Sequence, residues 1–301
     1  MSDQSRLGTC GVGSVDRGIQ LRASGSGGGR SPGKNRGMDR FTTSDGIEIA
    51  YHRFQPTVGS TSAGAGAGRP TVVLQHGFAA DTEANWVRPG VVAALTAAGR
   101  NVVSVDARGH GASDKPHDPK FYGEGRMARD LVELFDLLEL GELDLVGYSM
   151  GAIVSLVTAS TDHRIRRMVV GGIGGRIAEL DGQTPRHLNR SAISDALLAD
   201  DIAAVADPMA RSFRRFADST GADRFALAAQ AQRVHSDAIA LGAITAPTLL
   251  LVGDADPLAA RPEVLAAAIP DCRVQIVSGD HLGAVGVPEF APAIVEFVGV
   301  S

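Results

Sequence analysis

Short apolar segments separated by helical segments are the feature that most constrains the fold of this 301-residue chain. Near-continuous apolar segments occur at residues 71–75, 101–105, 143–147, 166–172 and 248–254. Between them, stretches such as residues 126–140 carry apolar side chains at helical spacing. Strands of this kind, separated by helices, indicate a mostly parallel sheet with helices on both faces. The predicted fold class is therefore α/β.

The same alternation divides the chain into three regions. Residues 1–37 consist mainly of Gly, Ser and Arg and offer little to bury, so we expect a disordered tail. An α/β core is expected over residues 38–174 and 245–301. Residues 175–244 carry Ala-rich helical patterns and no convincing strand, which predicts a helical cap inserted over the sheet.

Composition argues against several classes of function. The net charge of −5 lacks the basic footprint of a nucleic-acid-binding protein. No apolar run reaches the length of a membrane span, and the N-terminus lacks the apolar core of a secretory signal. Cys10 and Cys272 lie far apart, and no cluster has metal-ligand spacing. We expect a cytoplasmic protein with a small-molecule substrate, no cofactor, no metal and no nucleic-acid or membrane partner; oligomeric state stays open.

The segment Gly147-Tyr148-Ser149-Met150-Gly151 matches G-x-S-x-G and lies directly between a predicted strand and a predicted helix. In this setting the glycines allow a sharp turn, which leaves the serine hydroxyl exposed at the carboxyl end of the strand. The helix N-terminus also directs unpaired N–H groups at the site. Ser149 is therefore the predicted nucleophile. A serine that merely caps a helix accounts less well for this setting.

A serine nucleophile needs a base, and the base needs a carboxylate to orient it. His281 follows the last predicted strand, at the same sheet edge as Ser149, and is the predicted base. The alternative is that His281 is an ordinary surface histidine in a loop, so its assignment as the base depends on its position after the last predicted strand. Asp254 and Asp256 both follow the preceding strand. Asp256 lies farther into the loop and is preferred, whereas Asp254 could instead bind loop amides.

Acyl transfer also requires donors for the developing oxyanion. The backbone N–H of Met150, directly after the nucleophile, is one expected donor. The second is the N–H of Phe78, since Gly77 before it lets the backbone approach closely. His76 is expected to be structural.

An apolar stripe in the predicted cap has two interpretations. It consists of Met209, Phe213 and Phe216, which recur at helical spacing. These side chains either pack the cap or line an acyl pocket.

Several segments, in this order, make the chain resemble the α/β-hydrolase family. They are His76–Phe78, Asp106–Pro116, Gly147–Gly151, Pro247–Pro257 and Gly279–His281. The resemblance implies an eight-stranded sheet with a helical cap. It also implies that Asp106 and Arg108 shape a turn beside the active site without taking part in chemistry.

The resemblance implies hydrolysis of ester, lactone or related acyl bonds of a small, largely apolar substrate through an acyl-enzyme. C–C bond hydrolases and cofactor-free perhydrolases share the same triad and are alternatives. A ligand-binding receptor on the same fold is a third hypothesis, against which the complete set of site residues argues. The natural substrate cannot be predicted because the cap determines it.

Overall fold

A computed structural model describes residues 36–56, 68–180, 190–233 and 235–299. The predicted tail up to residue 35 and nearly all of the Gly/Ala-rich segment 59–68 lie outside these residues. The prediction that the tail extends to residue 37 is wrong by two residues. Arg36 and Gly37 belong to the first strand, where they pair with Phe54 and Arg53.

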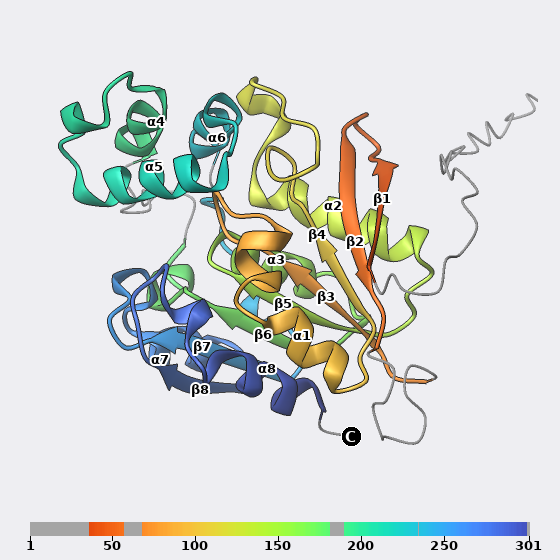
Figure 1. Cartoon of the computed structure of the whole chain (residues 1–301). Helices are drawn as coiled ribbons and strands as arrows, with labels where there is room; N and C mark the ends of the chain where they lie inside the picture. The colour runs from red at the N-terminus through yellow and green to blue at the C-terminus, as the bar shows by residue number, and fades with distance from the viewer. Residues whose placement is uncertain (1–35, 57–67, 181–189, 234, 300–301) are drawn as a thin grey trace, which may run out of the picture.

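Eight strands form one sheet in the order β1-β2-β4-β3-β5-β6-β7-β8. Among the described residues, β2 pairs antiparallel with both β1 and β4, and all other neighbouring strands of the sheet pair in parallel. This topology confirms the predicted mostly parallel eight-stranded sheet (Figure 1). The strands are β1 (Arg36–Thr42), β2 (Glu48–Phe54), β3 (Thr71–Gln75), β4 (Val102–Val105), β5 (Leu143–Tyr148), β6 (Ile165–Gly171), β7 (Thr248–Gly253) and β8 (Cys272–Val277).

Helices cover both faces of the sheet because successive side chains of its buried strands point to opposite sides. Val72 and Leu74 pack in one apolar cluster with α1 (Val91–Ala97) and α8 (Phe290–Gly299). Val73, between them, packs in the other cluster. That cluster includes residues of α2 (Glu124–Leu137), α3 (Met150–Ala159) and α7 (Pro262–Ala268). None of the helices in the described ranges is both long and apolar enough to cross a membrane.

A separate group of helices lies between β6 and β7 in sequence and beyond one edge of the sheet in space (Figure 1). It comprises α4 (Arg190–Leu198), α5 (Pro208–Thr220) and α6 (Arg224–Ala231). Asp207 and Asp223 cap the amino ends of α5 and α6, because the Asp207 carboxylate accepts one backbone hydrogen bond from the first turn of α5 and the Asp223 carboxylate accepts two from that of α6. The helices share an apolar cluster that also contains Ala79 of the core. We call this group the cap helices.

A buried cluster of charged side chains lies at the opposite edge of the sheet, where the parallel strands begin. Asp144 of β5 accepts hydrogen bonds from both Arg100 and Arg166. Both guanidinium groups also donate to the carbonyl oxygen of Val298 in α8, at 2.7 and 2.8 Å. The Arg100 and Asp144 side chains are at most 3% exposed. Because a buried charge that loses its partner costs about 3–5 kcal/mol, this cluster holds α8 against the sheet.

Candidate active site

A strained turn at the end of β5 presents Ser149. The residue has φ 54° and ψ −113° and begins α3. Neighbouring backbone leaves no room for side chains on either side of it. A Cβ on Gly147 would lie 2.3 Å from the Gly151 oxygen, and one on Gly151 would lie 2.1 Å from the Gln75 oxygen. The G-x-S-x-G spacing therefore follows from the geometry of the turn, whose strain costs about 1–3 kcal/mol.

The structure brings Ser149, His281 and Asp256 into one hydrogen-bonded line. Ser149 Oγ lies 2.9 Å from His281 Nε2, and His281 Nδ1 lies 2.9 Å from Asp256 Oδ2. The buried Asp256 carboxylate can only accept, so Nδ1 carries the hydrogen and Nε2 presents a lone pair to the serine hydroxyl. Asp256 Oδ1 accepts a second hydrogen bond from the Leu258 N–H at 2.8 Å, which fixes its orientation.

The other carboxylate of this loop lies elsewhere. Asp254 is exposed, and its Oδ1 accepts a hydrogen bond from the Gly279 N–H at 2.9 Å. It therefore ties the loop after β7 to the loop that carries His281 and does not touch the imidazole.

Tyr148 contacts His281, and the sequence analysis did not predict this contact. Its hydroxyl donates to the His281 carbonyl oxygen at 2.8 Å, and the two rings lie 5.6 Å apart. Burial raises the pKa of Tyr148, so the hydroxyl stays a neutral donor.

The loop after β3 lies directly beside Ser149. A Cβ built on Gly77 would lie 3.4 Å from the Ser149 Cβ, which is van der Waals contact, so the backbone of this loop lies close to Ser149. The N–H of Gly77 is held by Asn85 Oδ1, and that of Ala79 by His110 Nε2. Between them, the N–H of Phe78 has no acceptor within the described ranges.

Two neutral histidines support this loop. His76 donates from Nδ1 to the Gly77 oxygen, while its Nε2 accepts the Ala107 N–H at 2.9 Å. His110 donates from Nδ1 to the Arg108 oxygen and accepts the Ala79 N–H at Nε2. Burial lowers the pKa of both imidazoles, that of His110 to about 3. Because both Nε2 atoms are occupied by backbone donors, His76 is placed as a structural residue.

Asp106 and Arg108 organise the adjoining turn. Asp106 accepts hydrogen bonds from His52 and from the N–H groups of Thr82 and Ala112. Burial alone would raise the pKa of Asp106, but the hydrogen bonds from His52 and from the Ala112 N–H, that from His52 foremost, help to hold the pKa well below its usual range. Arg108 is fully buried and pairs with Asp130 and other acceptors.

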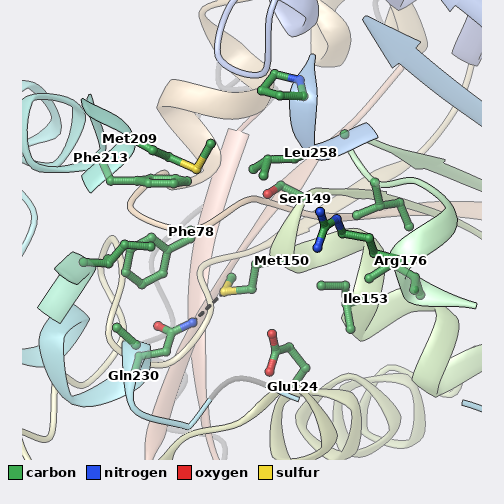
Figure 2. Close-up of a pocket in the computed structure, with 16 residues that line it drawn as sticks. Phe78, Glu124, Ser149, Met150, Ile153, Arg176, Met209, Phe213, Gln230 and Leu258 are labelled. Atoms are coloured by element: carbon green, nitrogen blue, oxygen red, sulfur yellow. Dashed lines mark hydrogen bonds between the residues drawn. The ribbon is translucent and has the colours of Figure 1, made fainter. Parts of the chain in front are cut away.

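A cavity of about 300 Å³ opens beside Ser149 (Figure 2). Its walls are largely apolar and include Phe78, Met150, Ile153 and Leu258.

The cap helices supply part of this wall. Met209 and Phe213 of α5 line the cavity, but Phe216 does not and packs in the apolar cluster of the cap helices. The prediction that all three could line a pocket is therefore wrong for Phe216. Phe216 lies about two helical turns along α5 from Met209, and at that distance its side chain is beyond the end of the cavity.

Polar groups that the sequence analysis did not single out share this cavity. They are Glu124 at the start of α2, Gln230 in α6 and Arg176 just after β6. Glu124 is buried and accepts the His235 N–H at 2.5 Å, and Gln230 donates to Met150 Sδ at 2.6 Å. These residues lie on separate elements, so no spacing along the chain connects them. In the part of the chain that is described, no group of His, Cys, Asp and Glu could hold a metal ion.

A family model of the α/β-hydrolase fold matches residues 70–217. The chain belongs to the α/β-hydrolase fold family. It is 34% identical over 147 residues to a 2-hydroxy-6-oxo-2,4-heptadienoate hydrolase of Pseudomonas putida. The matched residues make up 48% of this chain and 48% of that protein. It is 31% identical over 141 residues to an esterase of Escherichia coli, covering 44% of this chain and 51% of that protein.

Among solved structures, a hydrolase from Pseudomonas aeruginosa has a similar fold, with a TM-score of 0.63 and 27% identity. That comparison covers 87% of this chain and 98% of the other. By contrast, the chain spans about half the length of the curated relatives that it matches in sequence.

Proposed function

We propose that this member of the α/β-hydrolase family is a serine hydrolase that cleaves ester, lactone or related acyl bonds of a small, largely apolar substrate. The observation that carries this proposal is the line of hydrogen bonds from Asp256 through His281 to Ser149, which ends in an apolar cavity. A serine hydroxyl becomes an effective nucleophile when a base of this kind can accept its proton.

In the acylation step, Ser149 Oγ attacks the carbonyl carbon while its proton passes to His281 Nε2. Asp256 stabilises the imidazolium that forms. The N–H groups of Phe78 and Met150 receive the negative oxygen, since both lie next to Ser149 and neither has an acceptor among the described residues. The C–O bond then breaks, and the imidazolium returns its proton to the departing alkoxide, which leaves an acyl-enzyme.

In the deacylation step, a water molecule takes the place of the alcohol. His281 accepts one of its protons, the hydroxide attacks the acyl carbon, and the bond to Ser149 Oγ breaks. Ser149 recovers its proton from His281, and the carboxylic acid is released. A lactone would yield a single hydroxy acid by the same steps.

C–C bond hydrolysis is the second candidate. The relative in Pseudomonas putida is named a hydrolase of a 2-hydroxy-6-oxo-dienoate, and its 34% identity is higher than that of the esterase in Escherichia coli. A panel of p-nitrophenyl esters, lactones and vinylogous diketones, assayed side by side, distinguishes the two activities.

Labelling with a fluorophosphonate tests the shared part of the proposal. The probe should attach once, to the peptide that contains Ser149, and Ser149→Ala should abolish labelling. Ser160→Ala, at the far end of α3, is the matched control and should label normally. Absence of labelling in a protein that still turns over esters would refute the nucleophile, and absence of both would favour a ligand-binding receptor.

A further inference from the structure

The cavity beside Ser149 contains a guanidinium group that the proposed mechanism does not use. Arg176 lies in the turn that follows β6, and Figure 2 shows its side chain directed into the cavity. Its neighbours Gly175 and Ile177 are buried, so the backbone on both sides is packed in place. The backbone that carries the arginine is thus packed in place near the carboxyl edge of the sheet.

Arg176 makes no hydrogen bond or ion pair with any residue that the structure describes. The acidic residue closest to it in sequence, Glu179, accepts two hydrogen bonds of 2.5 and 2.7 Å from Arg261. These hydrogen bonds, with a smaller contribution from the charge of Arg176, lower the pKa of Glu179. Arg176 is an exposed residue whose side chain is directed at the cavity, so solvent weakens its attraction to an anion and the expected gain in affinity is modest. Guanidinium also matches a carboxylate in shape, since it can donate two parallel hydrogen bonds.

Glu124 lines the same cavity. It is buried, and its carboxylate accepts a hydrogen bond from the His235 N–H. Arg176 would attract an anionic group that enters the cavity, and the hydrocarbon part of that ligand would contact Ile153, Ile177 and Phe213.

We propose that Arg176 binds a carboxylate of the substrate, so that the substrate is an acyl compound with an apolar body and a separate anionic end. This inference rests on the proposed function for its catalytic test, and it narrows the substrate class from apolar to amphiphilic. Arg176 acts on specificity and takes no part in proton transfer.

The first experiment compares substrates matched in length. The full chain is assayed with p-nitrophenyl hexanoate and with the p-nitrophenyl monoester of adipic acid, which adds a terminal carboxylate on the acyl side. Butyl hexanoate and 3-carboxypropyl hexanoate form the second pair, with the carboxylate on the alcohol side. In one of the two pairs, the anionic member should have a kcat/KM about fivefold higher or more, chiefly through a lower KM.

The substitution Arg176→Gln should remove that preference, and Arg176→Lys should retain part of it. Arg215→Gln is the control, because Arg215 is an exposed residue of α5 outside the cavity. High salt should reduce the preference of the wild type but not that of Arg176→Gln. A wild type that hydrolyses neutral and anionic esters equally well, or an Arg176→Gln variant with an unchanged ratio, would overturn the inference while leaving the proposed function intact.

A binding measurement keeps the inference testable if no ester is turned over. Calorimetry on the Ser149→Ala protein should show that hexanoate binds at least about fivefold more tightly than hexanamide. The double variant with Arg176→Gln should bind both ligands alike. Equal affinities in the first protein would refute carboxylate recognition, whatever reaction the protein catalyses.

Discussion

Replacement of Asp256 by Asn tests most directly how the proposed catalytic base, His281, is oriented. In the structure, Asp256 Oδ1 accepts the Leu258 N–H and Oδ2 accepts the hydrogen on His281 Nδ1. Asn can keep the first interaction through its carbonyl oxygen, and its NH₂ group then faces the imidazole. Because NH₂ is a donor, Nδ1 must become the acceptor, and the hydrogen moves to Nε2. Nε2 then has no lone pair with which to accept the proton of Ser149.

The expected loss in kcat/KM for Asp256→Asn is about 10³- to 10⁴-fold, which corresponds to roughly 4–5.5 kcal/mol of transition-state stabilisation. Asp254→Asn is the matched comparison two residues away. Its carbonyl oxygen can still accept the Gly279 N–H, so we expect less than about a tenfold loss.

Steady-state kinetics on a p-nitrophenyl ester, with thermal melts to verify folding, decide between the carboxylates. If Asp254→Asn proves the worse variant, or Asp256→Asn keeps more than about a tenth of the activity, the argument from the imidazole tautomer is refuted.

Further predictions address the nucleophile, the turn, acid stability and metal independence. Ser149→Ala should lower ester hydrolysis at least about 1000-fold with an unchanged melting curve, and substantial residual turnover would contradict the assignment. Gly151→Ala should destabilise the fold by about 3 kcal/mol or more, because its Cβ would meet the Gln75 oxygen at 2.1 Å; a melt like that of wild type would disprove the packing argument. The buried His110 has a folded pKa of about 3, below its unfolded value, so its contribution to stability is present above about pH 6.5 and is lost as the pH falls. Urea unfolding at pH 7 and 5 should show a loss of about 2 kcal/mol from this group, and His110→Gln should flatten that dependence; an unaltered slope would point to other groups. Activity should survive prolonged EDTA treatment, and loss that a divalent ion restores would show a metal requirement.

The sheet was predictable because its strands are buried on both faces and are therefore apolar throughout. Residues 71–75 coincide with β3, and the segments at 143–147 and 248–254 differ from β5 and β7 by one residue at one end. The start of β1 was not predictable. Arg36 and Gly37 have the composition of the tail and are ordered by pairing with β2, which is a tertiary effect.

The hydrogen-bonding residues of the site were predictable because each follows a strand whose carboxyl end lies at the same edge. The cavity was predictable only in part. Helical spacing grouped Met209, Phe213 and Phe216, but it could not show where along α5 the cavity ends. Arg176, Glu124 and Gln230 meet only through the folding of three distant elements. Arginine, glutamate and glutamine are common in surface loops and helices, so nothing in the local sequence indicated that these three residues would line a cavity.

The cluster around Asp144 has a consequence for synthesis on the ribosome. Arg100 and Val298 contact each other across 198 positions of the chain, and both arginines that neutralise Asp144 also need the Val298 oxygen. Until α8 has left the exit tunnel, these charges have to remain hydrated, so β5 and β6 cannot be buried at that edge. We therefore expect this part of the nascent chain to stay open, and exposed to chaperones, until α8 has been synthesised and has emerged. A premature stop before α8 should yield a chain for degradation, with no partly active fragment.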